Sequence, residues 1–357
     1  MQLRGVIAFL AAAVAATQAQ IEVSAAEKGV LVRDLLAWKA SNAAVVAKEM
    51  GLYPTQDNHE STQGFTNDEL QRFANSKKIV EHLRKEQPNA VFSLDGPFAL
   101  LTTDEFKAYV ARGFRDQEDL ASLANESTTM DADDNDVPYG VDWTQSGCLA
   151  PVKNQGKCGS CTYFSATAAV ESANCIHTGE LVLFSEQRTL SCFGNGCRGG
   201  LAVNNLEWIK ENGMCRAEDW PYTSGKSQDN GECTANKCKP ELLPISEVVR
   251  VAKNEGALKK ALVDRPVAVS VSAGNDYWRF YKGGIIEECG KGGTDHSVLA
   301  VGYNNDDGDY WKIKNSWGPT WGEEGFVRLR RGNAGPDNQG TCRLFYRNPS
   351  FPLFSTE

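Results

Sequence analysis

The stretch KNQGKCGSCTYFSA, residues 153–166, places two cysteines three positions apart, Cys158 and Cys161. Such a pair can be half of a zinc site, a redox pair, two structural thiols, or one disulfide partner beside a reactive thiolate. Zinc would need a second close pair, which Cys233 and Cys238 could supply. A thioredoxin-like pair would need a strand before it in a βαβ unit, and the surroundings of Cys161 do not have that pattern.

The start of the chain decides the compartment. Residues 1–20 read MQLRGVIAFLAAAVAATQAQ, with Arg4 before an apolar run that ends in small residues. This pattern predicts a secretory signal peptide over residues 1–19. No later stretch has the ~18 apolar residues of a membrane-spanning helix, so we expect no membrane partner. The net charge of −9 argues against nucleic acid as the main partner.

The cysteine count then gains a meaning. In an oxidising compartment, 11 cysteines predict five disulfides and one remaining thiol, which disfavours both zinc and a redox pair. All eleven lie between Cys148 and Cys342, and the first 147 residues have none. The chain therefore divides into a cysteine-free N-terminal segment and a cysteine-rich remainder.

The two parts also differ in predicted secondary structure. Residues 20–110 are mostly helical in pattern, with a capping box at Thr66 and Glu69. Residues 115–137 are acidic and polar, predict an exposed linker, and hold a glycosylation sequon at Asn125. Beyond them the pattern predicts a helix over 161–177 with a glycine stop at Gly179, then β-branched strands within 266–273, 296–303, 310–317 and 325–331. A helical half followed by a β half predicts two packed lobes of the α+β class.

A catalytic thiolate needs a lowered pKa and a base. Cys161 begins the predicted helix, whose dipole favours a negative charge at that end. Of the four histidines, His59 and His82 lie in the cysteine-free segment, and His177 lies about 24 Å away at the far end of the helix. His296, at the start of a predicted strand, therefore remains as the base.

The base needs an orienting group, and the reaction needs donors for an oxyanion. Asn315 is the candidate orienter, with Trp317 to shield the contact from water. Gln155 lies six residues before Cys161 and can aim its amide at the same point as the backbone N–H of Cys161.

At this point four blocks of the sequence resemble the signature blocks of papain-like cysteine proteases. They read VKNQGKCGSC, LFSEQRTLSCFGNGCRGG, GGTDHSVLAVGY and WKIKNSWGPTWGEEGFVRLRRG, and in order they span almost all of residues 137–357. In this family CGSC precedes Trp or Tyr, and His and Asn follow about 130–150 residues later. His296 and Asn315 follow Cys161 by 135 and 154 residues.

The N-terminal segment carries a weaker resemblance. RFANSKKIVEHL and FALLTTDEF are similar to stretches of cathepsin-L-like propeptides, although Leu100 stands where an acidic residue is usual. The resemblance implies a signal peptide over 1–19, an inhibitory helical propeptide over 20–134 that ends in the acidic linker 115–134, and a peptidase domain over 135–357. That domain would have a papain-like two-lobe fold, with a helical lobe and a β-barrel-like lobe.

The resemblance also implies roles. Cys161 would be the nucleophile, His296 the base and acid, Asn315 the orienter and Gln155 the oxyanion donor. No metal or cofactor is expected. The chain would be a monomer that is secreted or lysosomal/vacuolar. It would be an endopeptidase, because the histidine-bearing loops of exopeptidase members are not visible. Its partners would be polypeptide substrates, its own propeptide and cystatin-type inhibitors.

Disulfide pairs are implied in the same way. Cys158 would bridge Cys197, Cys289 would bridge Cys342, and Cys192 would bridge Cys233 or Cys238. The pairing of the remaining cysteines, which include Cys148, Cys175 and Cys215, stays open. Cys158 is then structural, and Cys161 is the thiol that the odd count leaves over.

Substrate-binding residues follow from the same resemblance. The backbone of Gly199 and Gly200 would pair with the substrate backbone. The other expected contacts are Leu201, Ala202, Ser270, Thr294, Asp295, Ser297, Trp317 and, at the floor of the main specificity pocket, Arg347 or, with a one-residue shift, Asn348. Arg347 would favour an acidic side chain two residues before the scissile bond.

Thr162 departs from the family pattern, because it replaces the usual aromatic residue after the nucleophile. We expect its smaller side chain to lower stability or alter propeptide docking while the chemistry is retained. The alternative is a catalytically inactive, protease-like binding protein, although all four catalytic positions are intact.

Overall fold

The computed structural model describes nine parts of the chain, which are residues 25–54, 64–114, 129–130, 137–234, 236–290, 292–304, 308–332, 335 and 338–355. The predicted signal peptide lies outside these residues, as do the sequon at Asn125 and all of the acidic linker except Thr129 and Met130. None of the helices within the described ranges combines the length and the apolar character needed to cross a membrane.

The N-terminal segment, residues 25–114, is mainly helical. Its helices are α1 (Ala25–Lys39), α2 (Asn42–Glu49), α3 (Asn67–Glu86) and α4 (Thr103–Val110), followed by the short helix η1 (Ala111–Phe114). The predicted capping box starts α3, since Thr66 and Glu69 exchange side-chain hydrogen bonds with each other's backbone. A second capping box, between Thr102 and Glu105, starts α4. The rings of Trp38 and Phe73 meet where α1 and α3 pack together.

The helical lobe is built around α5 (Cys161–Thr178), most of whose side chains are buried. Its end matches the sequence prediction, because Gly179 takes the left-handed conformation with φ of 79°. Small residues such as Ala166 and Ala173 let neighbouring elements approach α5 closely. The other helices of this lobe are α6 (Glu186–Phe193), η5 (Gly196–Arg198), α7 (Ala202–Asn212) and α8 (Ser224–Ser227).

From residue 245 on, the described part of the β lobe has seven strands, of which the second, fourth, fifth and sixth match the four that the sequence predicts. The seven strands are β4 (Ile245–Val251), β5 (Val267–Val271), β6 (Tyr281–Ile286), β7 (His296–Asn304), β8 (Tyr310–Lys314), β9 (Phe326–Arg330) and β10 (Ser350–Phe354), with the helices α9 (Glu255–Asp264) and α10 (Asp276–Arg279) between them. The strand order is β1-β6-β9-β8-β7-β5-β10-β4-β2, with β3 (Val141–Asp142) beside β7. Because its two ends do not pair, the described sheet is open rather than a closed barrel.

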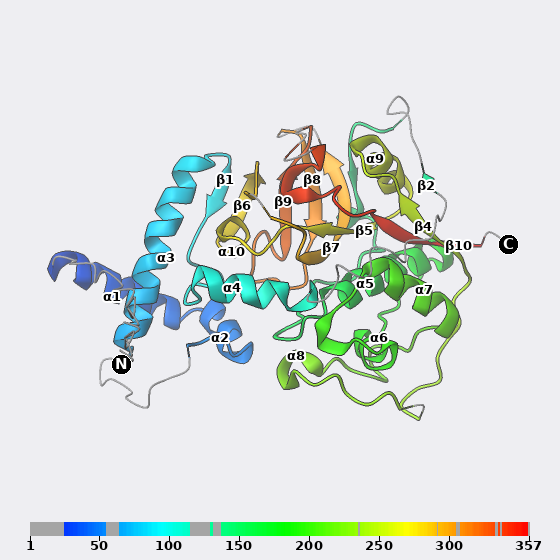
Figure 1. The fold of residues 1–357 in the computed structure, drawn as a ribbon, viewed down its shortest axis with the longest axis horizontal. Helices are drawn as coiled ribbons and strands as arrows, with labels where there is room; N and C mark the ends of the chain where they lie inside the picture. The colour runs from blue at the N-terminus through cyan, green and yellow to red at the C-terminus, as the bar shows by residue number, and fades with distance from the viewer. Residues whose placement is uncertain are drawn as a thin grey trace, which may run out of the picture.

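The N-terminal segment adds to the β lobe and runs along both lobes (Figure 1). Its strand β1 (Ala90–Phe92) pairs antiparallel with β6, with Val91 opposite Gly283. Further along, β2 (Thr129–Met130) pairs parallel with β4. Figure 1 shows α4 crossing from the β lobe toward the helical lobe. The segment therefore lies over the junction of the two lobes, where the predicted catalytic residues come together.

Candidate active site

Cys161 is the first residue of α5 and the one cysteine of the eleven that forms no disulfide. Its side chain is completely buried. Burial raises the pKa of this thiol to about 12, while hydrogen bonds from the backbone of Ser297 and Thr162 work in the opposite direction. In this covered state Cys161 is therefore a neutral thiol.

His296 is the first residue of β7, opposite Val271 of β5. Its Nε2 lies 2.7 Å from Oδ1 of Asn315. Because that contact occupies Nε2, the other ring nitrogen, Nδ1, is left for a second partner. Burial lowers the pKa of His296 to about 4, with the Asn315 contact acting the other way. The imidazole is therefore neutral above about pH 4 in the covered state.

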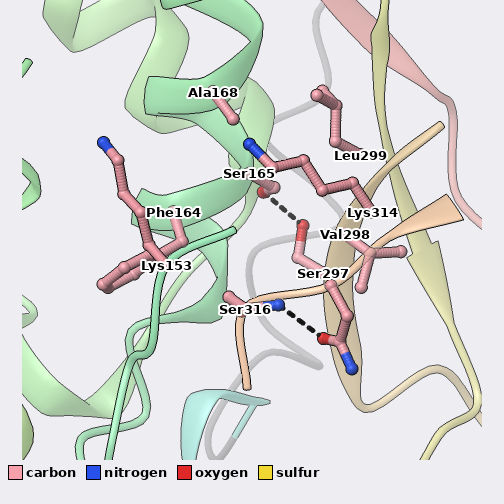
Figure 2. A pocket seen from close by; sticks show the side chains of 10 residues that line it. Lys153, Phe164, Ser165, Ala168, Ser297, Val298, Leu299, Lys314 and Ser316 are labelled. Atoms are coloured by element: carbon pink, nitrogen blue, oxygen red, sulfur yellow. Dashed lines mark hydrogen bonds between the residues drawn. The ribbon is translucent and has the colours of Figure 1, made fainter. Parts of the chain in front are cut away.

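A hydrogen bond between the lobes joins the elements that carry these two residues. Ser165, one turn after Cys161, and Ser297, next to His296, have hydroxyl oxygens 2.7 Å apart (Figure 2). The backbone of Ser297 also contacts the Cys161 thiol. The pair lines a cavity of about 20 Å³, which is enough for one water molecule. The structure thus brings Cys161 against the strand that starts at His296.

Asn315 and Gln155 are held by the same residue, Ser316. The backbone N–H of Ser316 donates to Oδ1 of Asn315 at 2.8 Å, and its hydroxyl donates to Oε1 of Gln155 at 2.7 Å. Nε2 of Gln155 then donates to the carbonyl of Cys158 at 3.2 Å. The Gln155 amide is therefore oriented with its N–H₂ toward the turn that precedes Cys161. The sequence does not predict a role for Ser316, because only its position next to Asn315 connects it with the site.

Aromatic rings shield His296 from solvent. Trp317 stacks on the imidazole with ring centroids 4.7 Å apart, as its predicted shielding role requires. Trp278 meets the same imidazole edge-on at 6.2 Å, and Trp321 packs on both tryptophans. Nothing in the local sequence around Trp278 linked it to the site, because it is 18 residues from His296 on another element.

The N-terminal segment covers this ring cluster. Phe98, Phe106 and Tyr109 surround the Trp317 ring at centroid distances of 5.3, 5.7 and 6.2 Å. The hydroxyl of Tyr109 donates to the carbonyl of Gly156, next to Gln155, at 3.0 Å. These contacts place Phe98, Phe106 and Tyr109 over the ring that stacks on His296, so this part of the N-terminal segment covers the imidazole side of the candidate site.

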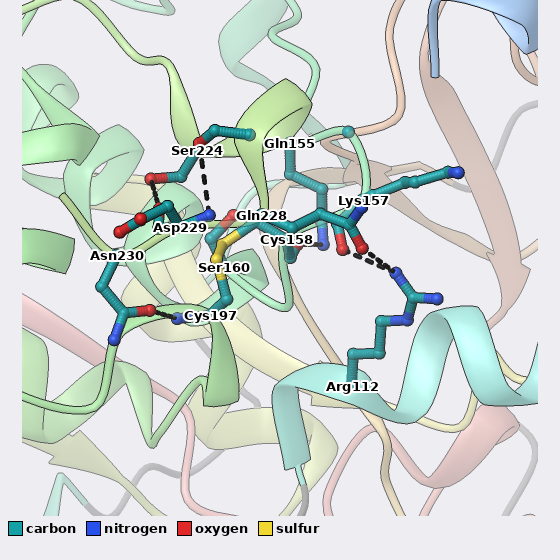
Figure 3. The surroundings of a disulfide bond; sticks show 12 residues. Arg112, Gln155, Lys157, Cys158, Ser160, Cys197, Ser224, Gln228, Asp229 and Asn230 are labelled. Atoms are coloured by element: carbon teal, nitrogen blue, oxygen red, sulfur yellow. Dashed lines mark hydrogen bonds between the residues drawn. A yellow bond between two sulfur atoms is a disulfide. The ribbon is translucent and has the colours of Figure 1, made fainter. Parts of the chain in front are cut away.

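Five disulfides frame the site, and four of them lie in the helical lobe. Cys158 pairs with Cys197 and ties the turn before Cys161 to the glycine loop that follows (Figure 3). Figure 3 also shows Arg112 of the N-terminal segment reaching this turn, where it donates to the carbonyl of Lys157 at 2.9 Å. The other pairs are Cys148–Cys175, Cys192–Cys233, Cys215–Cys238 and Cys289–Cys342.

The predicted substrate-binding residues fall into two groups. Gly199 ends η5 with φ of 75°, and Gly200, Leu201 and Ala202 lead from it into α7. On the β lobe, Ser270 pairs with Ser297 in the β5–β7 ladder, and the Ser297 hydroxyl is turned toward Ser165. The two groups come from opposite lobes, as the walls of one cleft would.

The two candidates for the pocket floor, Arg347 and Asn348, make different hydrogen bonds. Nε of Arg347 donates to Oγ1 of Thr294 at 3.0 Å, whereas Nδ2 of Asn348 donates to the carbonyl of Val251 in β4. Arg347 therefore lies with Thr294, and Asn348 faces β4. Burial lowers the pKa of Arg347 without removing its charge at neutral pH. Beside Thr294, the Asp295 carboxylate accepts backbone N–H groups of Ala273 and Gly274, while burial raises its pKa to about 6.

Taken together, a two-lobed α+β fold, a single free thiol at a helix start and an imidazole held by an amide define a cysteine peptidase. No cluster of three or more metal-ligating side chains occurs within the described ranges. A comparison with known families supports the assignment, because residues 137–347 match the model described as papain family cysteine protease. The chain belongs to this family.

Several relatives extend the similarity beyond that domain. Germination-specific cysteine protease 1 of Arabidopsis thaliana is 37% identical over 300 residues, which cover 80% of this chain and 78% of the relative. Chymopapain of Carica papaya is also 37% identical, over 79% of each chain. The family model starts at residue 137, and both alignments cover more of the chain than the part from there to its end. Both alignments therefore reach into the N-terminal segment.

Solved proforms share the whole arrangement. The ragweed pollen cysteine protease Amb a 11 in its proform matches with a TM-score of 0.74 and 27% identity, over 92% of this chain and 95% of the other. The recombinant stem bromelain precursor matches with a TM-score of 0.75 and 28% identity, over 92% and 100%. The chain is therefore similar to papain-family proteases in which the propeptide is still attached.

Proposed function

We propose that this chain is the zymogen of a cysteine endopeptidase, in which residues 20–134 are the inhibitory propeptide and residues 135–357 the peptidase domain. Cys161 attacks the scissile carbonyl, and His296 takes the thiol proton and later gives it to the leaving amine. Asn315 orients the imidazole through the 2.7 Å contact with Nε2, and this contact beside the free thiol is the observation that carries the proposal. Gln155 and the backbone N–H of Cys161 stabilise the oxyanion.

Latency follows from the protonation states of the covered site. Burial raises the pKa of the Cys161 thiol and lowers the pKa of the His296 imidazole, so both groups are neutral between about pH 4 and pH 12. Removal of the propeptide lets water reach both groups. The helix dipole at Cys161 then favours thiolate, and the imidazolium formed beside it stabilises that charge.

The substrate would lie across the two groups of cleft residues. The backbone of Gly199 and Gly200 pairs with the substrate backbone, and Leu201, Ala202, Ser270, Thr294 and Ser297 form the main specificity pocket. Arg347 at the pocket floor favours an acidic side chain two residues before the scissile bond, and its hydrogen bond to Thr294 supports this position. A peptide library that returns only aliphatic or aromatic residues at this position would rule this preference out.

Entry into the secretory pathway is part of the proposal. Residues 1–19 are the signal peptide, and five disulfides suit an oxidising compartment. The mature enzyme is then a monomer that is secreted or delivered to a lysosome or vacuole, where cystatin-type inhibitors would meet the open cleft.

Active-site labelling tests the function directly. Residues 20–357 are expressed, acidified to about pH 4–5 to release the propeptide, and treated with an epoxide or vinyl-sulfone thiol probe. Labelling of the wild type with a shift to a mature form near residue 135, and none in Cys161→Ala, is expected. A folded, processed wild type that takes up no probe would instead favour the inactive, protease-like binding protein.

A further inference from the structure

Arg279 is a buried arginine that the proposed mechanism does not use. It is the last residue of α10 in the β lobe, and only 2% of its surface is exposed. Arginine is rarely buried so completely unless its hydrogen-bond donors are satisfied. Its guanidinium lies over the Phe280 ring at 4.2 Å, which fixes the plane of the fork.

The partners of Arg279 come almost entirely from the N-terminal segment. Nη1 donates to Asp276 of the same helix at 3.0 Å. On the opposite edge, Nε donates to the carbonyl of Phe98 at 3.3 Å, and Nη2 donates to Oγ of Ser76 at 2.7 Å and to the carbonyl of Leu101. Removal of residues 20–134 would therefore leave Asp276 in place and uncover the whole Nε–Nη2 edge.

Two neighbouring residues, Trp278 and Phe98, connect this edge with the surroundings of His296. Trp278, adjacent in sequence to Arg279, contacts the His296 ring, and Trp317 stacks on that ring. Phe98 contacts both Trp317 and Arg279. Its ring packs on the Trp317 ring at 5.3 Å, and its carbonyl accepts a hydrogen bond from Arg279. Since His296 gives its proton to the leaving amine, a group beside it faces the leaving-group half of the substrate.

We propose that Arg279 holds the propeptide in the zymogen and, after activation, binds a carboxylate on the leaving-group side of the substrate. The Nε–Nη2 edge matches the two oxygens of a carboxylate in a bidentate fork. In the zymogen, carbonyl and hydroxyl oxygens of residues 76–101 occupy this edge. The carboxylate comes from an acidic side chain in the first two residues after the scissile bond, or from the C-terminus of a short substrate.

This inference rests on the proposed function, so the experiment first secures that function. Three quenched peptides share one sequence before the scissile bond and differ after it. One carries Glu and a C-terminal amide, one Gln and an amide, and one Gln and a free carboxylate two residues after the bond. They are cleaved at pH 6, where Glu is ionised, by enzyme matured from the full chain.

The wild type is expected to cleave at least one carboxylate peptide with a kcat/KM about tenfold above the Gln amide, the size of one charge-assisted hydrogen bond pair. The Glu and free-carboxylate arms tell which source is used. In Arg279→Gln the ratio is expected to fall to about one, whereas Lys282→Gln should keep it, because Lys282 is an exposed cation on the neighbouring strand. Raising the salt should shrink the wild-type ratio.

The zymogen gives a second readout. At neutral pH, the uncleaved Arg279→Gln chain should take up the thiol probe about tenfold faster than wild type, since two hydrogen bonds to the propeptide backbone are lost. Lys282→Gln should label at the wild-type rate. If Arg279→Gln does not fold, Arg279→Lys takes its place, because it keeps the charge and loses the bidentate fork, and its peptide ratio should fall below that of the wild type.

The outcomes separate the two proposals. Cleavage of all three peptides at equal rates by the wild type overturns the role of Arg279 in substrate binding and leaves the protease function standing. Equal labelling of the Arg279→Gln and wild-type zymogens overturns its role in holding the propeptide. Absence of both cleavage and probe uptake in a processed wild type overturns the proposed function, and the inference with it.

Discussion

The two sides of the cleft are made rigid by different means. The cysteine side, residues 148–238, holds four of the five disulfides, and its central helix presents small residues such as Ala166 and Ala173. The histidine side has one disulfide, Cys289–Cys342, and instead packs two fully buried tryptophans on the imidazole, with a third, Trp321, against both of them.

This contrast fits what each proposed catalytic residue needs. Cys161 is placed by backbone, since it begins a helix and follows a turn, and covalent links hold backbone segments in register. His296 must keep one ring plane, and large rings packed against its face and edge provide that. Loss of ring packing should therefore destabilise mainly the β lobe, and loss of disulfides should destabilise mainly the helical lobe.

Trp321→Ala is expected to have the largest effect. The ring is fully buried between Trp278, Trp317 and Tyr281, and its Nε1 donates to the carbonyl of Trp278 at 2.9 Å. Truncation should lower the free energy of unfolding by about 3–5 kcal/mol. Urea unfolding of the full chain in a Cys161→Ala background, which prevents self-cleavage, measures it. Trp321→Phe should lose less, and a loss below about 1 kcal/mol in the alanine variant would contradict ring packing as the main support.

Removal of one disulfide of the helical lobe should have the second-largest effect on stability. Cys148 and Cys175 close a loop across 27 residues, so replacing both with alanine should cost about 3 kcal/mol. The amide-exchange signal of the segment that carries Trp317 and Trp321 should stay unchanged, because the ring cluster lies in the other lobe. A collapse of that signal in the folded variant would show that the two supports are not separate.

Asp295→Asn should change how stability depends on pH. The pKa of Asp295 is raised from 3.8 to about 6, so between these values the folded protein holds a proton that the unfolded chain releases, and stability falls as pH rises. The pKa of His296 is lowered from 6.5 to about 4, so over its window stability rises with pH. The two effects oppose each other in the wild type.

With the aspartate gone, the His296 effect stands alone. Lowering the pH from 6.5 to 4 should then destabilise the Asp295→Asn chain by about 2–3 kcal/mol more than the wild type. Urea unfolding at both pH values, again in the Cys161→Ala background, tests this. Parallel losses in the two proteins would mean that Asp295 carries no proton in the zymogen.

Thr162→Val should have the smallest effect on stability, and it should raise the free energy of unfolding rather than lower it. Oγ1 of Thr162 is fully buried, and among the described residues it has no hydrogen-bond partner. Valine keeps the shape and removes the unpaired oxygen, so the unfolding free energy should rise by about 1 kcal/mol. Thr162→Ser keeps the hydroxyl and loses a methyl group, and should therefore be less stable than wild type. A valine variant no more stable than wild type would point to a water bound to this hydroxyl.

Local signals in the sequence predicted much of this molecule. The helix from Cys161 to its glycine stop, the capping box at Thr66 and the strand that starts at His296 all appear as expected, because each depends on residues within a few positions. The two-lobe fold follows from the order of these elements and from the family resemblance.

Contacts between distant residues could not be predicted in this way. Cysteine spacing left Cys192 with two partners and Cys148, Cys175 and Cys215 with none, since spacing does not give connectivity. The Ser165–Ser297 hydrogen bond joins residues 132 positions apart, and Arg279 meets Phe98 across 181. Serine and arginine are ordinary surface residues in a sequence, and only the packed fold shows that these are buried.

The pairing of β1 with β6 has a consequence for the proposed mature enzyme, from which residues 20–134 are removed. While residues 90–92 are attached, the edge of the sheet is capped, with Val91 and Ala90 opposite Gly283 and Gly284. Once they leave, β6 becomes an outer strand whose peptide groups can recruit another extended chain, which is how sheets begin to aggregate. Lys282 and the two glycines make β6 a poor template for pairing with another strand. The residues that pair with the propeptide should therefore also disfavour self-association of the activated enzyme.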